Sequence, residues 1–121
     1  MRMCDEKISM LAVGDREIPR DEAGFLMEPT DWDEDVAKII AAEENIELNS
    51  EHWAIIKFVR DCFEQDQITP DARLAYRFLA KANGLNRNDA RKHFYELFPY
   101  GYVTQTCRIA GMRQPRTWST G

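Results

Sequence analysis

The chain has 121 residues, of which 44% are hydrophobic and 11% aromatic, and its mean hydropathy is −0.55. This length and composition predict a single domain over residues 1–121 and exclude a multidomain enzyme. Apolar runs are only a few residues long, far below the roughly 20 residues that cross a bilayer, and the N-terminus lacks the layout of a signal peptide. We therefore expect a cytoplasmic protein without membrane insertion.

Charge is divided unevenly along the chain, although the net formal charge is only −5. Residues 1–64 carry 17 acidic and 7 basic side chains, whereas residues 65–121 carry 4 acidic and 9 basic ones. Two explanations stay open: two differently solvated faces, or a C-terminal half that meets an anionic group or an acidic partner.

A small β-hairpin is predicted over about residues 7–26. Residues 8–13 are rich in strand formers, Gly14-Asp15 is a favourable turn pair, and residues 16–19 supply the second strand. A short third strand is expected at Phe25-Leu26. A hairpin of this size is marginal alone, so it must pack on the segments that follow.

Helical periodicity dominates residues 31–110, and five helices are expected there. The first is capped by Thr30 or Asp31, and the second by Asn49 or Ser50. The third starts at Pro70, presents Leu74, Phe78, Leu79 and Ala82 inward, and stops at Gly84. Asn88 caps the fourth, and the last runs from about Tyr100 to Ala110. The expected fold is thus mainly helical (α+β), with a polar, basic C-terminal arm over residues 111–121.

The three cysteines, Cys4, Cys62 and Cys107, match no disulfide framework and no metal-binding or redox motif. The two histidines, His52 and His93, have no metal-ligand spacing, and the glycines never cluster into a phosphate-binding loop. The sequence therefore indicates neither a metal nor a cofactor. We interpret Cys62 as a small apolar side chain on a helix face and Cys4 as part of the terminus.

Cys107 is the cysteine with reactive potential. It lies near the end of the last predicted helix, and Arg108, Arg113 and Arg116 follow it, each able to favour a thiolate. The negative end of the helix dipole opposes them, so the sequence leaves the direction of the pKa shift open.

Residues 70–98 suggest a different activity. Two helices joined by a short glycine-containing turn resemble a helix-turn-helix, and the stretch is basic, with Arg87, Arg91 and Lys92 as possible nucleic-acid contacts. Helical hairpins with surface arginines are much commoner than DNA-binding modules, and the net negative charge opposes nonspecific phosphate binding.

Four motifs resemble the DsrC/TusE family, also called the gamma-subunit family of dissimilatory sulfite reductase. They are DEAGFL with PTDW, the helix start ELNSEHW, the turn LFPYG, and TCRIAGMRQP before the C-terminus. The resemblance extends from about Lys7 to Pro115. It implies a helical domain with a small β-hairpin, a helix-turn-helix-like pair and a flexible C-terminal arm that bears cysteine.

Family members with sulfur chemistry carry a persulfide on an outer cysteine of that arm, and some also have an inner cysteine, with ten residues between the two. Cys107 matches the inner cysteine, and the outer position falls on Trp118. Because tryptophan cannot carry a persulfide, only Cys107 remains for this role. The resemblance thus marks the chain as a divergent member.

Two functions follow from this departure. In the first, the protein is a sulfur carrier without stand-alone turnover. It accepts or responds to sulfur at Cys107, receives it from a sulfurtransferase-type donor, and serves a sulfite reductase or a tRNA-thiolation complex. In the second, it is a noncatalytic regulatory paralogue that binds DNA or the family's protein partners.

Overall fold

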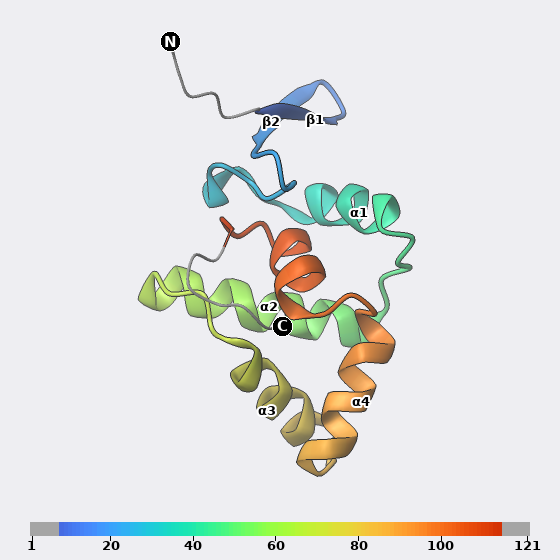
Figure 1. Ribbon diagram of the computed structural model, residues 1–121. Helices are drawn as coiled ribbons and strands as arrows, with labels where there is room; N and C mark the ends of the chain where they lie inside the picture. Colours follow the sequence, from blue (N-terminus) through green and yellow to red (C-terminus); the bar gives the residue numbers. More distant parts are fainter. Residues whose placement is uncertain (1–7, 115–121) are drawn as a thin grey trace.

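The computed structural model describes residues 8–114, which form a two-stranded hairpin followed by five helices and one short 3-10 turn (Figure 1). The predicted mainly helical α+β class is confirmed. In chain order the elements are β1 (Ser9–Val13), β2 (Arg16–Arg20), η1 (Pro29–Asp31), α1 (Glu34–Glu43), α2 (Ser50–Asp66), α3 (Ala72–Asn83), α4 (Arg87–Leu97) and η2 (Tyr102–Cys107).

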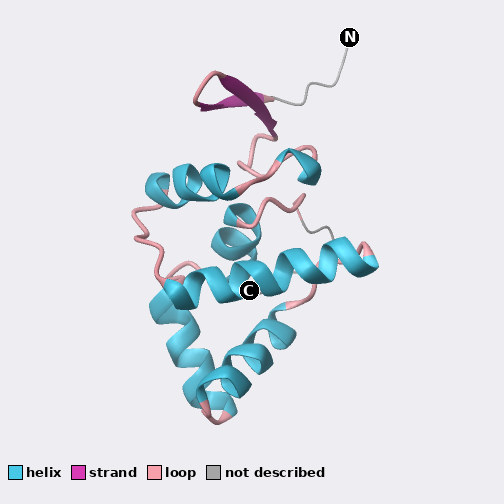
Figure 2. Ribbon diagram, turned by 180° about the vertical axis from the view of Figure 1, so that it is seen from behind, coloured by secondary structure: helices cyan, strands magenta, loops and turns pink. Residues whose placement is uncertain are grey.

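The helix η2 lies in the middle of the molecule. In both ribbon views it is enclosed between α1 and α2, while α3 and α4 form a helical hairpin at the end opposite the β-hairpin (Figures 1 and 2). None of the helices within residues 8–114 combines the length and apolarity that crossing a membrane requires.

The β-hairpin forms as predicted, with β1 and β2 antiparallel and Leu11 paired with Ile18. Alternation buries Leu11, Val13 and Ile18 against the helices, which is how this small sheet gains its stability. The expected third strand shrinks to one bridge between Arg20 and Leu26. The reason is local: the Asp21 carboxylate accepts hydrogen bonds from the Ala23 and Phe25 N–H groups and closes a turn there instead.

The start of α1 differs from the prediction. Residues Pro29–Asp31 form the 3-10 turn η1, and Asp33 is the N-cap, its carboxylate accepting the Val36 N–H at 3.0 Å. This hydrogen bond, opposed by desolvation and supported by Arg16, lowers the pKa of Asp33. The caps expected at Thr30 or Asp31 are therefore wrong, because Asp33 offers the same chemistry nearer the first buried residue.

Asn49 caps α2, as predicted, within a reciprocal capping box that includes His52. The Asn49 N–H donates to His52 Nδ1 at 3.0 Å, so Nε2 bears the proton and donates to the Leu97 carbonyl at 2.8 Å. Burial lowers the pKa of His52 and favours this neutral form. His52 thus joins the start of α2 to the end of α4 and is a structural histidine.

The third helix begins at Ala72 with Asp71 as its cap, not at Pro70, and it ends at Gly84 as predicted. The predicted inner face of α3 is wrong at two positions, because Leu74 is 40% exposed and Ala82 is exposed. The buried residues are Ala75 and Leu79. The helix turns its i, i+4 pair of Ala75 and Leu79 inward because α4 approaches closely there.

The last two helices start at other residues than expected. Asn86, not Asn88, caps α4 by accepting the Asp89 N–H at 2.8 Å. The final helix starts at Tyr102 rather than Tyr100, after Gly101 with φ +94°. Residues 102–107 form a π-helix and residues 108–109 follow in α-helical form, so the helix ends within one residue of the expected Ala110. Single π turns occur mostly within α-helices and frequently at functional sites, and the last residue of this π turn is Cys107.

Candidate functional site

Cys107 is fully buried at the C-terminal end of η2. The same turn buries Tyr102, whose hydroxyl donates to the Pro70 carbonyl and so fixes η2 to the loop between α2 and α3. Cys107 therefore belongs to the central core.

The environment of Cys107 favours the thiol over the thiolate. Burial raises the pKa of Cys107 to about 12, against a smaller opposing contribution from the Tyr102 hydroxyl. Burial likewise raises the pKa of Tyr102, so its phenol is neutral. The direction that the sequence left open is thus upward, and Cys107 is protonated in this conformation.

The arginines beside Cys107 interact elsewhere. Arg108 Nη1 lies 2.7 Å from the Glu44 carboxylate, and its guanidinium carbon lies 5.2 Å from the ring centre of Phe25. Arg113 donates to the Met27 carbonyl at 3.1 Å and lies 3.8 Å from a Glu28 carboxylate oxygen. In this conformation Arg108 and Arg113 are therefore paired away from Cys107, and neither is a cause of its pKa shift. Arg116 lies outside the described residues.

Trp32 and Arg60 hold the segment directly after Cys107, and we call this arrangement the Trp32–Arg60 clamp. Trp32 Nε1 donates to the Ile109 carbonyl at 2.9 Å. Arg60 Nη1 donates to the carbonyls of Ala110 at 3.1 Å and Pro29 at 3.2 Å. The guanidinium carbon lies 4.5 Å from the centre of the Trp32 ring, so each side chain also orients the other.

Gly111 completes the clamp through close approach to Trp32. It has φ +77°, and a Cβ placed there would lie 2.4 Å from Trp32 Cδ1. Only glycine combines that backbone angle with that contact. The indole therefore presses directly on the main chain four residues after Cys107.

The segment after Cys107 stays packed in the core beyond Gly111, as far as Met112. Met112 is fully buried, and Thr69 Oγ1 lies 3.2 Å from its sulfur. Gly111 and Met112, which the sequence assigned to the arm, thus lie in the core. Trp118 and Cys4 lie outside the described residues, so the structure does not place the outer position of the family relative to Cys107.

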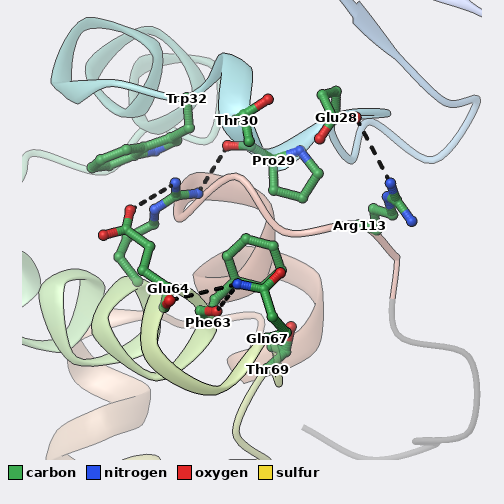
Figure 3. A pocket seen from close by; sticks show the side chains of 10 residues that line it. Glu28, Pro29, Thr30, Trp32, Phe63, Glu64, Gln67, Thr69 and Arg113 are labelled. Carbon is green, nitrogen blue, oxygen red and sulfur yellow. Dashed lines mark hydrogen bonds and ion pairs between the residues drawn. The ribbon is translucent and has the colours of Figure 1, made fainter.

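An open cleft of about 690 Å³ borders the clamp between η1 and the end of α2 (Figure 3). Its lining includes Trp32, Arg60 and Arg113, but not Cys107. Arg60 is 6% exposed, and burial lowers its pKa while Glu64 opposes the shift; a guanidinium stays cationic nevertheless. The cleft thus gives solvent access to the outer side of the clamp and leaves the thiol covered.

Neither Trp32 nor Arg60 was singled out by the sequence as a site residue. A signal existed for Arg60: it stands at i+4 from Ile56 on the apolar face of α2, where a charge is costly unless hydrogen-bonded. Trp32 lies in the PTDW motif but has no periodic pattern of its own. Their contacts span 77 and 50 residues of sequence, which local patterns do not reveal.

The other predicted site residues lie on a separate element. Arg87, Arg91 and Lys92 are exposed on α4, at the end of the molecule opposite the β-hairpin, with Arg91 6.0 Å from the centre of the Tyr76 ring (Figure 1).

Cys62 is half-buried on α2, and burial raises its pKa. Within residues 8–114 no group of three or more His, Cys, Asp or Glu side chains is placed to hold a metal ion.

Fold and site together are those of a small helical protein with a fully buried cysteine, Cys107, just before its C-terminal segment. Comparison with known proteins identifies its family. The family model described as DsrC like protein matches residues 12–118, and the chain belongs to this family.

Curated relatives and solved structures agree. The sulfurtransferase TusE of Salmonella typhimurium is 38% identical over 106 residues, covering 88% of this chain and 96% of that protein, and TusE of Escherichia coli is 36% identical over the same length. The oxidized gamma-subunit of the dissimilatory sulfite reductase (DsrC) from Archaeoglobus fulgidus has a TM-score of 0.81 and 34% identity, covering 92% of this chain and all of that one. Allochromatium vinosum DsrC has a TM-score of 0.80 and 34% identity over 93% of this chain and all of that one. The resemblance stated from the motifs is thereby confirmed.

Proposed function

We propose that this protein is a cytoplasmic sulfur-relay protein of the DsrC/TusE type, which accepts or responds to sulfur at Cys107. The observation that carries the proposal is the place of Cys107: it matches the family's inner cysteine, and it directly precedes the segment held by the Trp32–Arg60 clamp. Its relatives are named as sulfurtransferases and as a sulfite reductase subunit. The partners we propose are a persulfide-bearing sulfurtransferase as donor, and a sulfite reductase or a tRNA-thiolation complex as acceptor.

Sulfur transfer to Cys107 proceeds by thiol–persulfide exchange. The Cys107 thiolate attacks the outer sulfur of a donor persulfide, a new S–S bond forms, and the S–S bond of the donor breaks. The donor leaves as a thiolate and takes up the proton that Cys107 has lost. One sulfur atom moves, and no external oxidant or reductant is consumed.

This exchange requires the clamp to open. A fully buried thiol with its pKa raised to about 12 is neither accessible nor ionised near neutral pH. Release of residues 109–112 from Trp32 and Arg60 would expose Cys107 and return its pKa toward the ordinary value. We therefore assign the described conformation to the resting state and the open one to the partner complex.

The test is intact-protein mass spectrometry of a Cys4→Ser, Cys62→Ser variant, in which Cys107 is the sole thiol, after incubation with a persulfide-loaded sulfurtransferase. We expect a gain of about 32 Da, one sulfur atom, that dithiothreitol removes. The matched control adds Cys107→Ser and should gain nothing. A folded single-thiol protein that stays at its original mass would refute carriage at Cys107.

The burial of Cys107 favours a second candidate, a noncatalytic paralogue that binds the family's partners. Such a protein keeps the fold of its relatives, and Trp118 at the outer position is consistent with lost carriage. Added to a relay reaction with a two-cysteine relative, it should slow sulfur loading in a dose-dependent way, and Cys107→Ser should slow it equally. The comparisons give no support to the DNA-binding variant of this candidate.

A further inference from the structure

The helical hairpin of α3 and α4 contains a small cavity, which we call the arginine cavity. It has a volume of about 290 Å³ and is lined by Arg73, Tyr76, Arg77, Ala80 and Arg87. Three of its five lining residues are cations, and none is a carboxylate. Nothing in the proposed sulfur chemistry uses these residues.

Two of the three arginines form no ion pair with a described residue, so their charge can act on a ligand. Arg73 lies 3.1 Å from the Asp71 carboxylate, but within residues 8–114 neither Arg77 nor Arg87 has an ion-pair partner within 4 Å. All three side chains are exposed at the rim, where a ligand can reach them. The first turn of α4 holds Asp89, which does not line the cavity.

The surroundings reinforce this positive charge. Residues 72–98 contain six basic and two acidic side chains, in a chain whose net charge is −5. Arg91, one turn after Arg87, lies over the Tyr76 ring and adds a fourth cation beside the lining. A concave surface lined by one sign of charge concentrates the field and attracts counter-ions.

We infer that the arginine cavity binds a tetrahedral oxyanion, a phosphate or a sulfur oxyanion such as sulfate or thiosulfate. Guanidinium groups present paired N–H donors whose spacing matches such anions, and arginines from two helices approach one anion from different sides. The cavity volume of about 290 Å³ admits one such ion. An extended nucleic acid is disfavoured, because the residues outside 72–98 carry 19 acidic and 10 basic side chains and so a net charge of −9.

The test is an NMR titration of the full chain with sodium phosphate, sulfate and thiosulfate in separate arms, at ionic strength held constant with sodium chloride. We expect saturable shifts of α3 and α4 amides in at least one arm. Arg77→Gln with Arg87→Gln should weaken that binding at least about tenfold, since two charge-assisted contacts are lost. The ratio of affinities between arms tells a phosphate site from a sulfur-oxyanion site.

The matched control removes two exposed cations elsewhere, by Lys38→Gln with Lys57→Gln, so that both variants have the same net charge. It should bind as the parent does. An equal loss in both variants, or shifts that rise without saturation, would reduce the effect to general charge and overturn the site. A short mixed-sequence DNA duplex that binds more tightly than every ion, and loses binding with Arg77 and Arg87, would replace the small-anion assignment.

Discussion

Gly111→Ala is the most direct perturbation of the Trp32–Arg60 clamp. The added methyl group meets the Trp32 side chain at 2.4 Å from Cδ1 and 2.7 Å from Cβ and Cγ, in a backbone conformation with φ +77°. Trp32 must move, and its movement breaks the hydrogen bond to the Ile109 carbonyl and the stacking on Arg60. We expect the segment after Cys107 to loosen.

The magnitude follows from two costs. A non-glycine residue at left-handed φ costs roughly 1–2 kcal/mol. Overpacking against the partly buried Trp32 ring costs about 1–3 kcal/mol. Together these predict a loss of about 2–5 kcal/mol in the free energy of unfolding. If local opening relieves half of the steric cost, about 0.5–1.5 kcal/mol, the population with Cys107 exposed rises about 2- to 13-fold, because about 1.4 kcal/mol corresponds to a factor of ten.

Gly84→Ala is the matched control, because Gly84 has φ +64° and no atom within 4 Å of the added methyl group. It carries the backbone cost without the clash. Urea denaturation measures stability, and the rate of reaction with a thiol reagent in the Cys4→Ser, Cys62→Ser background measures exposure of Cys107. Equal destabilisation by both substitutions, with no faster labelling in Gly111→Ala, would refute the clamp.

Three further outcomes are expected. Hydrogen bonds from His93 to the Glu51 and Glu96 carboxylates raise the pKa of His93. The stabilisation from this histidine is therefore present below its unfolded pKa of about 6.5 and is lost as pH rises through the folded value. By urea denaturation, His93→Gln should reduce stability by up to about 1 kcal/mol at pH 5.5 and by less at pH 8. Arg60→Lys should cost about 1–3 kcal/mol in the same assay, since one ammonium replaces a fork whose Nη1 donates to two carbonyls and whose Nη2 donates to Glu64. An unchanged midpoint would contradict this. Iodoacetamide at pH 8 should modify half-buried Cys62 well before Cys107, as peptide mass mapping can show, and the reverse order would disprove the resting state.

Local sequence signals predicted the elements well because their causes are local. The Gly14-Asp15 turn, the Asn49 cap and the Gly84 stop each depend on hydrogen bonds or backbone angles within a few residues. Where two residues can cap the same helix, as Asp31 and Asp33 can, the position of the first buried residue determines which of them is the N-cap. Tertiary packing sets that position.

The helix face of α3 and the clamp were not predictable in the same way. Periodicity gives a stripe but not its exact rotation, so Leu74 was expected inside although Ala75 is the buried residue. The contact of Arg60 with the Ala110 carbonyl joins residues 50 positions apart. Only the fold reveals that a cation on α2 holds the main chain after Cys107.

The ionisation of Cys107 depends on the same long-range packing. Sequence places arginines and a helix end near the thiol, and their effects on its pKa oppose each other. The structure adds desolvation, which outweighs the opposing hydrogen bond from Tyr102 and raises the pKa from 9.0 to about 12. That shift corresponds to about 4 kcal/mol, or a roughly thousandfold smaller thiolate population. An opening of the clamp that costs less than about 4 kcal/mol therefore yields more thiolate from the open form than from the closed one. Because the closed thiolate is also inaccessible, any sulfur chemistry at Cys107 must proceed through opening of the clamp.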